Sequence, residues 1–262
     1  MKKIVSIGRG GVGKTVFIAL LAKYFRDQKP ILLIDADPDQ NLAEMTGVDL
    51  GKNGTKTVSD ILFDVKFDKI EEGLKSLALA DKIDYLFNQK VLYEGKYFDF
   101  ISIGTKWTEG CYCQPNNILK GIIAKIEKHY SYVLIDSPAG LEHLNRRITS
   151  SIDEIFAIID PSWKAFESAK RVHKLVQEIG IKFKNFYAVA NYRFPDERLE
   201  SIEKETGLKF AGKLRYDEDI ENYSLSGKSI FELIEDSPAF NSIKEIMKKV
   251  VLQGKVWVSP LD

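Results

Sequence analysis

The chain has few cysteines and no long apolar run. Its 262 residues include only two cysteines, Cys111 and Cys113, which are one residue apart. Such a pair cannot supply the disulfide framework of a small secreted domain and indicates a reducing compartment, so we predict a cytoplasmic protein. No stretch approaches the roughly 18 apolar residues that a membrane-spanning helix needs. We therefore expect no membrane partner.

The chain also lacks an excess of charge of either sign. Lys and Arg total 38, Asp and Glu total 38, and the formal net charge is zero. A non-specific nucleic-acid binder normally carries a basic excess that neutralises phosphates. We therefore expect no nucleic-acid partner. Hydrophobic residues make up 44% of the chain, which at this length is enough to bury a full core.

Short β-branched segments alternate with amphipathic segments along the chain. This alternation is typical of βαβ units, and strands that are apolar throughout are typical of a sheet covered on both faces. We predict a doubly wound, mostly parallel α/β fold in a single domain that spans residues 1–262. The expected strands are Ile4–Ile7, Ile31–Ile34, Asp99–Ile103, Tyr132–Ile135, Ile155–Ile159, Phe186–Ala190 and Phe210–Leu214. The expected helices are Lys14–Arg26, Asn117–Lys128, Lys164–Glu178 and Asn241–Val251.

The segment 51–97 interrupts this alternation. It begins with a turn-like run, Gly51-Lys52-Asn53-Gly54, and continues with a helix predicted from Val58 and a weakly patterned remainder. We interpret 51–97 as an insertion packed on the same domain. The tail 254–262 is expected to be loosely attached.

A glycine-rich loop follows the first expected strand. Gly8-Arg9-Gly10-Gly11-Val12-Gly13-Lys14-Thr15 matches the phosphate-loop pattern G-x-x-x-x-G-K-[ST] between a strand and a helix. The glycines allow backbone N–H groups to converge on phosphate oxygens, and the helix N-terminus adds partial positive charge. In such a loop Lys14 reaches the β- and γ-phosphates and the Thr15 hydroxyl binds Mg²⁺. The candidate nucleotide-binding residues are Gly8, Arg9, Gly10, Gly11, Val12, Gly13, Lys14, Thr15 and Val16.

The same loop also satisfies the dinucleotide-binding pattern G-x-G-x-x-G. Gly8, Gly10 and Gly13 have that spacing, and Asp35 lies near the distance at which a Rossmann fold places its ribose-binding acid. A dinucleotide site, however, has no use for Lys14 and a Mg²⁺-binding hydroxyl at this turn. We therefore interpret the loop as a phosphate loop, with dinucleotide binding as the alternative.

Two of the expected strands end in carboxylates. Ile31–Ile34 is followed by Asp35-Ala36-Asp37-Pro38, and Tyr132–Ile135 is followed by Asp136. A phosphate-loop enzyme needs a carboxylate beside its Mg²⁺ and a second group that orients the attacking water. In an open α/β sheet these groups belong at the carboxyl ends of strands near the loop. The alternative is that these aspartates only cap turns.

Three ordered motifs together resemble the MinD/ParA class of ATPases, which also includes the nitrogenase iron protein and metal-cluster assembly ATPases. They are Arg9–Thr15, Asp35–Pro38 and Asp136-Ser137-Pro138-Ala139-Gly140. The resemblance implies a homodimer that closes on two ATP molecules and uses Mg²⁺-dependent hydrolysis as a switch.

The same resemblance assigns roles to individual residues. It implies that Asp37 orients the attacking water and that Asp136 holds Mg²⁺ through a water molecule. Asn191, which follows the expected strand 186–190, resembles the residue that reads adenine. A turn residue at the strand end is the alternative for Asn191.

The chain departs from this class at two positions. It has Arg9 where the class carries a signature Lys, and Val16 where a second Thr or Ser is usual. The signature Lys crosses the dimer interface to the partner's phosphates, and an Arg can also grip phosphate with two parallel hydrogen bonds. The guanidinium of Arg9 is longer and planar, and it need not fit the position that the signature Lys occupies at the dimer interface. We therefore predict that ATP binding is kept and hydrolysis is impaired or modest, with Arg9, Lys14, Asp37 and Asp136 as the catalytic residues.

The cysteine pair lies between the expected strand 99–103 and the helix expected from Asn117. In extended chain, residues i and i+2 point to the same side, so Cys111 and Cys113 present two thiolates together. A thiolate zinc site or a square-planar nickel site usually has four donors, and a two-fold dimer axis would supply the other two. The alternative is a pair of small buried hydrophobic residues.

The segments Glu109–Asn117 and Ala139–Leu144 resemble the CooC family of nickel-insertion ATPases, which mature carbon monoxide dehydrogenase, and relatives that serve acetyl-CoA synthase. This resemblance implies an ATP-dependent metallochaperone. It would bind Ni²⁺, or Zn²⁺ as a surrogate, through Cys111 and Cys113 of both protomers and deliver it to a client nickel–iron–sulfur enzyme. Two other functions stay open: a redox protein with a [4Fe–4S] cluster bridging the dimer, and a positioning ATPase that acts on membrane or DNA.

Overall fold

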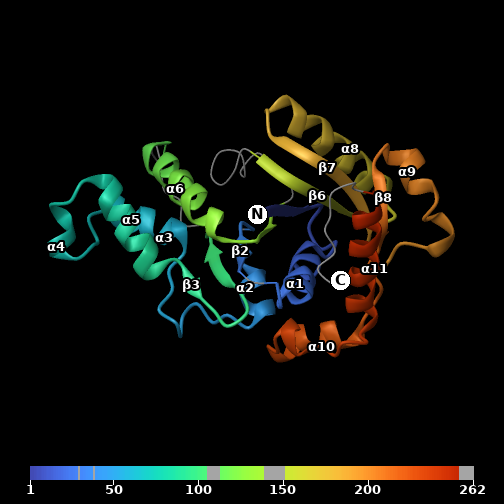
Figure 1. Cartoon of the computed structure of the whole chain (residues 1–262), viewed down its shortest axis with the longest axis horizontal. Helices are drawn as coiled ribbons and strands as arrows, with labels where there is room; N and C mark the ends of the chain where they lie inside the picture. The colour runs from blue at the N-terminus through green and yellow to red at the C-terminus, as the bar shows by residue number, and fades with distance from the viewer. Residues whose placement is uncertain (29, 38, 105–112, 139–150, 254–262) are drawn as a thin grey trace.

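A parallel sheet forms the centre of the molecule. The computed structural model describes the chain except for residues 29, 38, 105–112, 139–150 and 254–262. Within the described residues the sheet has eight strands in the order β3-β4-β2-β5-β1-β6-β7-β8 (Figure 1). All neighbours pair in parallel except β3, which pairs antiparallel with β4 at one edge. The strands are β1 Lys2–Ile7, β2 Ile31–Asp35, β3 Tyr93–Glu94, β4 Asp99–Ser102, β5 Tyr132–Asp136, β6 Ser151–Ile159, β7 Lys182–Ala190 and β8 Lys209–Lys213.

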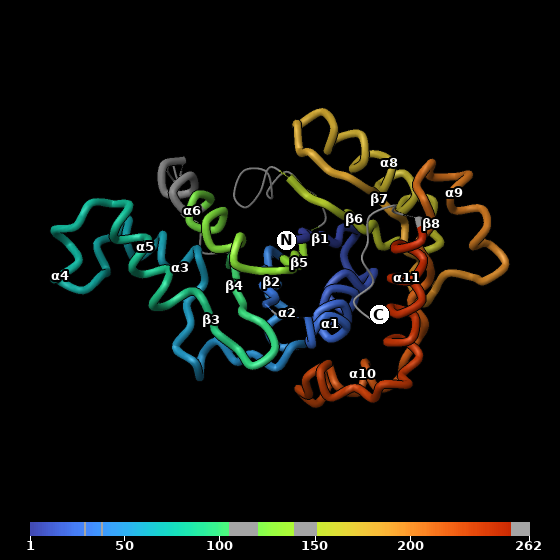
Figure 2. The backbone as a smooth tube through the Cα atoms, in the orientation of Figure 1, coloured from blue at the N-terminus to red at the C-terminus, as the bar shows by residue number. Residues whose placement is uncertain are grey.

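Helices cover both faces of this sheet (Figures 1 and 2). They are α1 Lys14–Phe25, α2 Asn41–Thr46, α3 Val58–Lys66, α4 Glu72–Lys75, α5 Leu79–Lys90, α6 Cys113–Ile126, α8 Trp163–Glu178, α9 Ser201–Thr206, α10 Glu218–Ser226 and α11 Pro238–Gln253, with the short 3₁₀ turns η1 Glu127–His129, η2 Asp196–Arg198 and η3 Ile230–Glu232. The predicted single-domain, doubly wound, mostly parallel α/β fold is confirmed.

The strands divide their side chains between two apolar layers. Ile4 and Leu134 face the layer that contains α1 and α11, whereas Val5 and Ile135 face the layer that contains α3, α5, α6 and α8. Each fully buried aliphatic side chain contributes about 1.5–3 kcal/mol relative to an exposed one. Both faces of a parallel sheet must therefore be covered, which explains the continuous apolar runs in the sequence.

Several elements begin earlier than the sequence patterns predicted. β6 and β7 start four residues before the expected Ile155 and Phe186, because their polar amino-terminal halves pair with each other from Ser151 and Lys182 onward. α11 begins at Pro238 instead of Asn241. Proline is favoured in a first helical turn, where its missing N–H is not needed. Apolar periodicity detects only the buried part of such elements.

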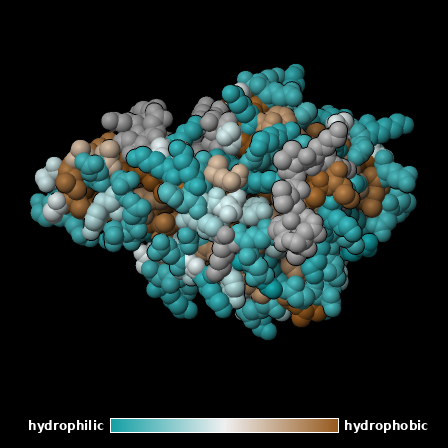
Figure 3. Space-filling view, in the orientation of Figure 1, coloured by the Kyte–Doolittle hydropathy of each residue, from teal (hydrophilic) through white to brown (hydrophobic). Residues whose placement is uncertain are grey.

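The segment 51–97 forms an arm built of α3, α4 and α5 at the β3 edge of the sheet (Figure 1). α3 begins at Val58, as predicted, because Thr57 and Asp60 form a reciprocal capping box. Side chains of α3 and α5 join the apolar layer that also contains α6. Figure 3 shows apolar side chains gathered at this end of the molecule, where Phe67, Leu77 and Tyr85 are exposed.

The sequence also predicted a loosely attached tail and no membrane-spanning helix. The tail 254–262 lies outside the described residues. Among the helices that the structure describes, none combines the length and the apolar composition needed to cross a membrane.

Candidate nucleotide site

The glycine-rich loop connects β1 to α1 at the carboxyl edge of the sheet. A Cβ atom at Gly8 would lie 2.5 Å from the Ile158 carbonyl oxygen, so only glycine allows the loop to pack against β6. Gly11 and Gly13 have φ values of +74° and +100°, which other residues adopt only with strain. α1 begins directly after Gly13 without a side-chain cap, and its first N–H groups therefore remain available to an anion.

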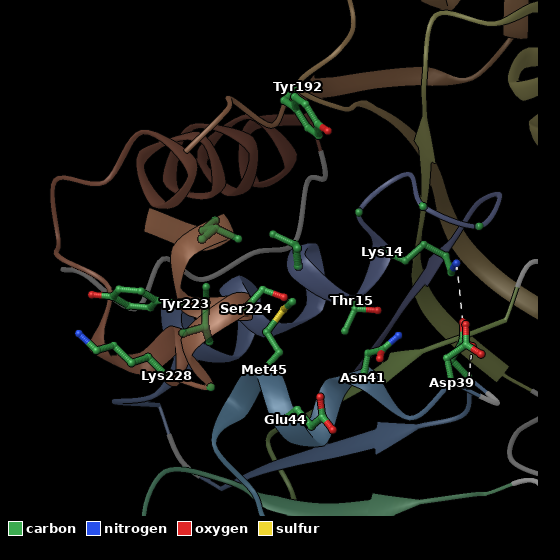
Figure 4. A pocket seen from close by; sticks show the side chains of 18 residues that line it. Lys14, Thr15, Asp39, Asn41, Glu44, Met45, Tyr192, Tyr223, Ser224 and Lys228 are labelled. Carbon is green, nitrogen blue, oxygen red and sulfur yellow. Dashed lines mark hydrogen bonds and ion pairs between the residues drawn. The ribbon is translucent and has the colours of Figure 1, made fainter. Parts of the chain in front are cut away.

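A cavity of about 470 Å³ opens over this loop. In Figure 4 the Lys14, Thr15 and Asn41 side chains point into it, while Tyr223 and Lys228 lie at its far end. Its walls come from the loop, from the segment after β2 with α2, and from α10 with the turn that follows. The lining residues are Gly10, Gly11, Gly13, Lys14, Thr15, Val16, Asp37, Asp39, Asn41, Glu44, Met45, Tyr192, Ile220, Tyr223, Ser224, Gly227, Lys228 and Ile230.

Lys14 curls over the loop toward the carboxylate after β2. The residue is only 6% exposed, and its ammonium donates to the Arg9 carbonyl oxygen over 3.3 Å. The same nitrogen lies 3.7 Å from Asp37 Oδ2. Asp37 Oδ1 accepts the Asp39 N–H at 3.1 Å, which holds its carboxylate at the cavity wall. The structure therefore brings the predicted residues Lys14 and Asp37 together beside the loop.

Asp136 ends β5 directly beneath the loop. Thr15 Oγ1 donates to Asp136 Oδ2 over 2.6 Å, and Ser6 Oγ donates to Oδ1 over 3.0 Å. The side chain is fully buried, and burial raises the pKa of Asp136 to about 6 despite the Thr15 bond and the charge of Lys14. A hydroxyl and a carboxylate in contact at the first turn of α1 are the pair of groups that a Mg²⁺ ion uses in phosphate loops.

Asp35 is a residue of the site to which the sequence patterns assigned no role in nucleotide hydrolysis. It ends β2 opposite Asp136, is fully buried, and accepts N–H groups from Asp37 at 3.2 Å and Leu42 at 3.1 Å. Burial, and next the charge of Asp136, raise the pKa of Asp35 to about 8. Its two hydrogen bonds tie the segment after β2 and the start of α2 to the sheet, so Asp35 positions Asp37.

A second cavity of about 290 Å³ adjoins the first one. Asn191 lies in its wall with 1% exposure, and Asn191 Oδ1 accepts the Arg193 N–H at 3.1 Å. Within the described residues Asn191 Nδ2 has no hydrogen-bond partner. A buried donor without a partner costs about 1–3 kcal/mol, which a ligand acceptor would recover. The sequence patterns missed Tyr192 and Tyr216, which also line this cavity and lie 5.6 Å apart between ring centroids.

Arg9 and Val16, the two departures from the class, occupy different surroundings. Arg9 Nη1 donates to Ser162 Oγ over 3.3 Å at the start of α8, and Arg9 is absent from the walls of both cavities described above. Val16 lines both cavities with an aliphatic side chain. It therefore offers packing where the class usually has a hydroxyl.

Most of the predicted cysteine site lies outside the residues that the structure describes. Cys111 is outside the described residues, and only the backbone of Cys113 is described. α6 begins at Cys113 and not near Asn117, so the expectation of extended chain through Cys113 is wrong. Pro115 in the first turn does not block the helix, because the first N–H groups of a helix have no intrahelical partner. The described residues contain no cluster of three or more His, Cys, Asp or Glu side chains arranged to hold a metal.

The raised pKa values of Asp35 and Asp136 lead us to predict that stability falls as pH rises. Their folded pKa values, about 8 for Asp35 and about 6 for Asp136, lie above the ordinary 3.8, so the folded chain retains protons that the unfolded chain has released. The stability from this effect is present at low pH and is lost as pH rises from about 4 to about 8. We expect the Tm of the Asp35→Asn variant, measured relative to that of the unsubstituted protein, to be higher at about pH 8 than at about pH 5. Thermal unfolding of both proteins at the two pH values, without nucleotide, measures this Tm difference. The same Tm difference at both pH values would contradict the prediction.

Comparisons with known proteins agree with this site. The family model described as an AAA domain matches residues 1–188. An ATP-binding protein of Methanocaldococcus jannaschii is 41% identical over 249 residues, which are 93% of this chain and 96% of that protein. The carbon monoxide dehydrogenase accessory protein CooC of Rhodospirillum rubrum is 26% identical over 249 residues, which are 90% of this chain and 91% of that protein.

A solved structure shares the fold. The MinD cell division protein of Aquifex aeolicus superposes with a TM-score of 0.68 at 20% identity, and the match covers 99% of this chain and 100% of that one. The phosphate loop, the adjoining carboxylates and the family match all point to nucleotide hydrolysis. This chain belongs to the AAA domain family as a P-loop ATPase, and it shares its fold with the MinD cell division protein.

Proposed function

We propose that this ATPase is a metallochaperone whose homodimer carries Ni²⁺ on Cys111 and Cys113 and releases it to a client nickel–iron–sulfur enzyme during the ATP cycle. The observation that carries the proposal is the position of the end of β4, the strand that precedes the cysteines in the sequence. β4 ends at Ser102, which pairs with Asp35, and Asp35 in turn pairs with Asp136. The segment that follows β4 and leads to the two cysteines therefore starts at the same edge of the sheet as Asp35 and Asp136.

A hydrogen bond supports a connection between these regions. Ser102 Oγ donates to Gln40 Oε1 over 3.3 Å, which joins the end of β4 to the segment that carries Asp37. A change in the Asp37 segment on hydrolysis would thus act on the strand that precedes the cysteines. The similarity to the Rhodospirillum rubrum accessory protein supports the same function.

The residues of the site fit ATP and Mg²⁺. Among the described residues, none would meet a side chain placed at the loop glycines Gly10, Gly11 and Gly13, and none pairs with Asn191 Nδ2, a donor suited to an acceptor on adenine. Lys14 and the first N–H groups of α1 would hold the phosphates. Mg²⁺, when bound at Thr15 and Asp136, would neutralise charge on the β- and γ-phosphate oxygens.

The chain's own residues then account for hydrolysis. Asp37 would orient a water molecule toward the γ-phosphorus, and attack forms a P–O bond to water as the bond to the ADP oxygen breaks. Lys14 would stabilise the charge that moves to the leaving oxygen. Arg9, directed toward α8, would act on the nucleotide of the partner protomer, not on its own.

Substituting Asn191 tests the adenine assignment. We expect Asn191→Ala to weaken ATP binding about tenfold, because a buried hydrogen bond contributes about 1.5 kcal/mol. The variant also loses the Oδ1 acceptor of the Arg193 N–H, which offsets the removal of the unpartnered amide nitrogen, so we expect the Tm to change little. Titration calorimetry with ATP and with GTP measures the effect. Equal affinity of the variant and the unsubstituted protein for ATP would show that Asn191 does not read the base.

Nickel content tests the metallochaperone proposal. We expect about half a nickel ion per chain after anaerobic loading and desalting, because one ion is shared across a two-fold axis. The Cys111→Ser/Cys113→Ser variant should lose this nickel and keep ATP hydrolysis. Nickel binding that does not depend on the cysteines would contradict the proposal. An iron–sulfur absorbance in anaerobically purified protein would instead favour the redox alternative, with the ATPase assignment intact.

A further inference from the structure

The helix α2, which follows the Asp37 segment, is held by a hydrogen bond near each of its ends. Near its start the Leu42 N–H donates to the buried Asp35 carboxylate over 3.1 Å. At its end the Thr46 carbonyl oxygen accepts the hydroxyl of Ser229 over 2.9 Å. Ser229 lies in the turn that follows α10, and both α2 and α10 contribute side chains to the nucleotide cavity (Figure 4). The helix is therefore fixed at one end to the sheet and at the other to the turn after α10.

The contact between the end of α2 and Ser229 is close. Gly47 ends α2 with a φ of +79°, and a Cβ atom added there would lie 2.9 Å from Ser229 Cβ. The Ser229 hydroxyl also accepts the Phe231 N–H at 3.3 Å, and the Ser229 N–H donates to the Glu232 carboxylate over 3.2 Å. One side chain thus joins α2 to the turn η3, and the contact leaves no room for a larger residue at position 47.

The turn η3 is itself fixed to the helix that follows the phosphate loop. The Lys23 ammonium on α1 donates to the carbonyl oxygens of Phe231 over 3.0 Å and Leu233 over 2.6 Å, and Lys23 is 2% exposed. Moving η3 away would deprive a buried ammonium of these two acceptors, which is unfavourable. Because α1 begins directly after the phosphate loop, the bond from Ser229 holds the far end of α2 in a constant position relative to that loop.

The backbone between Asp37 and α2 is strained. Gln40 has a φ of +54°, a left-handed conformation that residues other than glycine rarely adopt. Its N–H donates to the Asp37 carbonyl oxygen over 3.1 Å. Such a conformation persists only where the surrounding structure holds it in place. The two hydrogen bonds at the ends of α2 supply that constraint, so loss of the bond from Ser229 lets the segment relax and moves Asp37.

We propose that Ser229 is a positioning residue for ATP hydrolysis. Through α2 it keeps the Asp37 carboxylate where that group orients the attacking water. The inference rests on the role of Asp37 in the proposed function, and it adds a residue from the opposite end of the sequence. Among the described residues that line the two nucleotide cavities, Ser229 is not included. Its removal therefore affects the hydrolysis step and not the affinity for ATP.

A serine pair tests this proposal. We expect Ser229→Ala to lower kcat about five- to tenfold and to leave KM for ATP within about twofold, because a small misplacement of a catalytic group slows only the chemical step. The control is Ser226→Ala, since the Ser226 hydroxyl donates to the Asn222 carbonyl oxygen over 2.7 Å within α10. It should keep both constants. Phosphate release over a range of ATP concentrations measures them, and thermal unfolding confirms that both variants are folded at the assay temperature.

A second variant approaches the same contact from α2. Gly47→Ala introduces a Cβ atom against Ser229 and should push the end of α2 away from η3. We expect it to lower kcat at least as much as Ser229→Ala does, again with KM for ATP within about twofold. An unchanged kcat in either folded variant, or a raised KM with unchanged kcat, would overturn the proposal.

A double variant separates positioning of Asp37 from a general loss of structure. In the Asp37→Asn background, Ser229→Ala should change kcat less than twofold, because the group that Ser229 positions is no longer a carboxylate. The same fold loss in both backgrounds would show a merely structural role and would overturn the proposal. If Asp37→Asn alone hydrolysed ATP at the full rate, the role of Asp37 in the proposed function would fail as well. A slow Asp37→Asn variant beside a fully active Ser229→Ala variant would overturn only the role of Ser229.

Discussion

Replacing Lys14 with alanine is expected to lower ATP hydrolysis by about 100-fold or more, the usual effect of removing one group that stabilises transition-state charge. Lys14 is the buried cation of the site, held between the Arg9 carbonyl group and Asp37. The variant loses the charge that the phosphates require and leaves Asp37 without its cation. Phosphate release at saturating ATP and Mg²⁺ measures the effect.

A matched lysine controls for this substitution. Lys52 is exposed, and its ammonium forms a surface ion pair with Asp49 at 3.2 Å. We expect Lys52→Ala to hydrolyse ATP at the rate of the unsubstituted protein. If Lys14→Ala kept more than about a tenth of that rate, its assigned role in charge stabilisation would be wrong.

We expect the Asp136→Asn variant to hydrolyse ATP about 100- to 1,000-fold more slowly than the unsubstituted protein in the presence of Mg²⁺. Asparagine has nearly the same size and can keep hydrogen bonds to Thr15 and Ser6, but it has no negative charge for the metal. Removing that charge also removes the repulsion with Asp35, so the variant should not be less stable near pH 8. Hydrolysis rates over a range of Mg²⁺ concentrations, together with thermal unfolding, measure both effects.

An aspartate at the opposite end of the sheet is the control. Asp153 accepts the Lys3 N–H at 2.8 Å and pairs with Lys184, far from the carboxyl edge. We expect Asp153→Asn to lower stability without changing the dependence of the rate on Mg²⁺. Equal Mg²⁺ dependence for Asp136→Asn and the unsubstituted protein would contradict the magnesium assignment.

Most of the central elements were predictable because burial imposes a periodic pattern on them. The strands Ile31–Asp35 and Tyr132–Asp136 are covered on both faces and read as continuous apolar runs. The two-residue strand β3 is too short to show any period. α10 was also missed, because none of its side chains is fully buried. Its inner face lines the nucleotide cavity and not the core.

The site divides in a similar way. The positions of the loop, Asp37 and Asp136 were predictable, since a phosphate loop constrains its residue types and strand ends place acids at one edge. The adenine-reading role of Asn191 came from the family resemblance and stays a prediction. The positioning role of Asp35 was not, because a sequence does not reveal which strand-end carboxylate receives backbone N–H groups. The wall formed by Tyr192, Tyr216 and α10 comes from segments about 200 residues away from the loop, and no local pattern links them.

The sequence by itself determined the fold class, the phosphate loop and the acids at the strand ends, because these depend on local residue types and short-range periodicity. Only the tertiary structure decided that Asp35 is buried beside Asp136, that the Asn191 amide nitrogen has no partner among the described residues, and that Arg9 turns toward α8. Each of these depends on which strands are neighbours in the sheet, and that order is set by long-range packing of the two apolar layers.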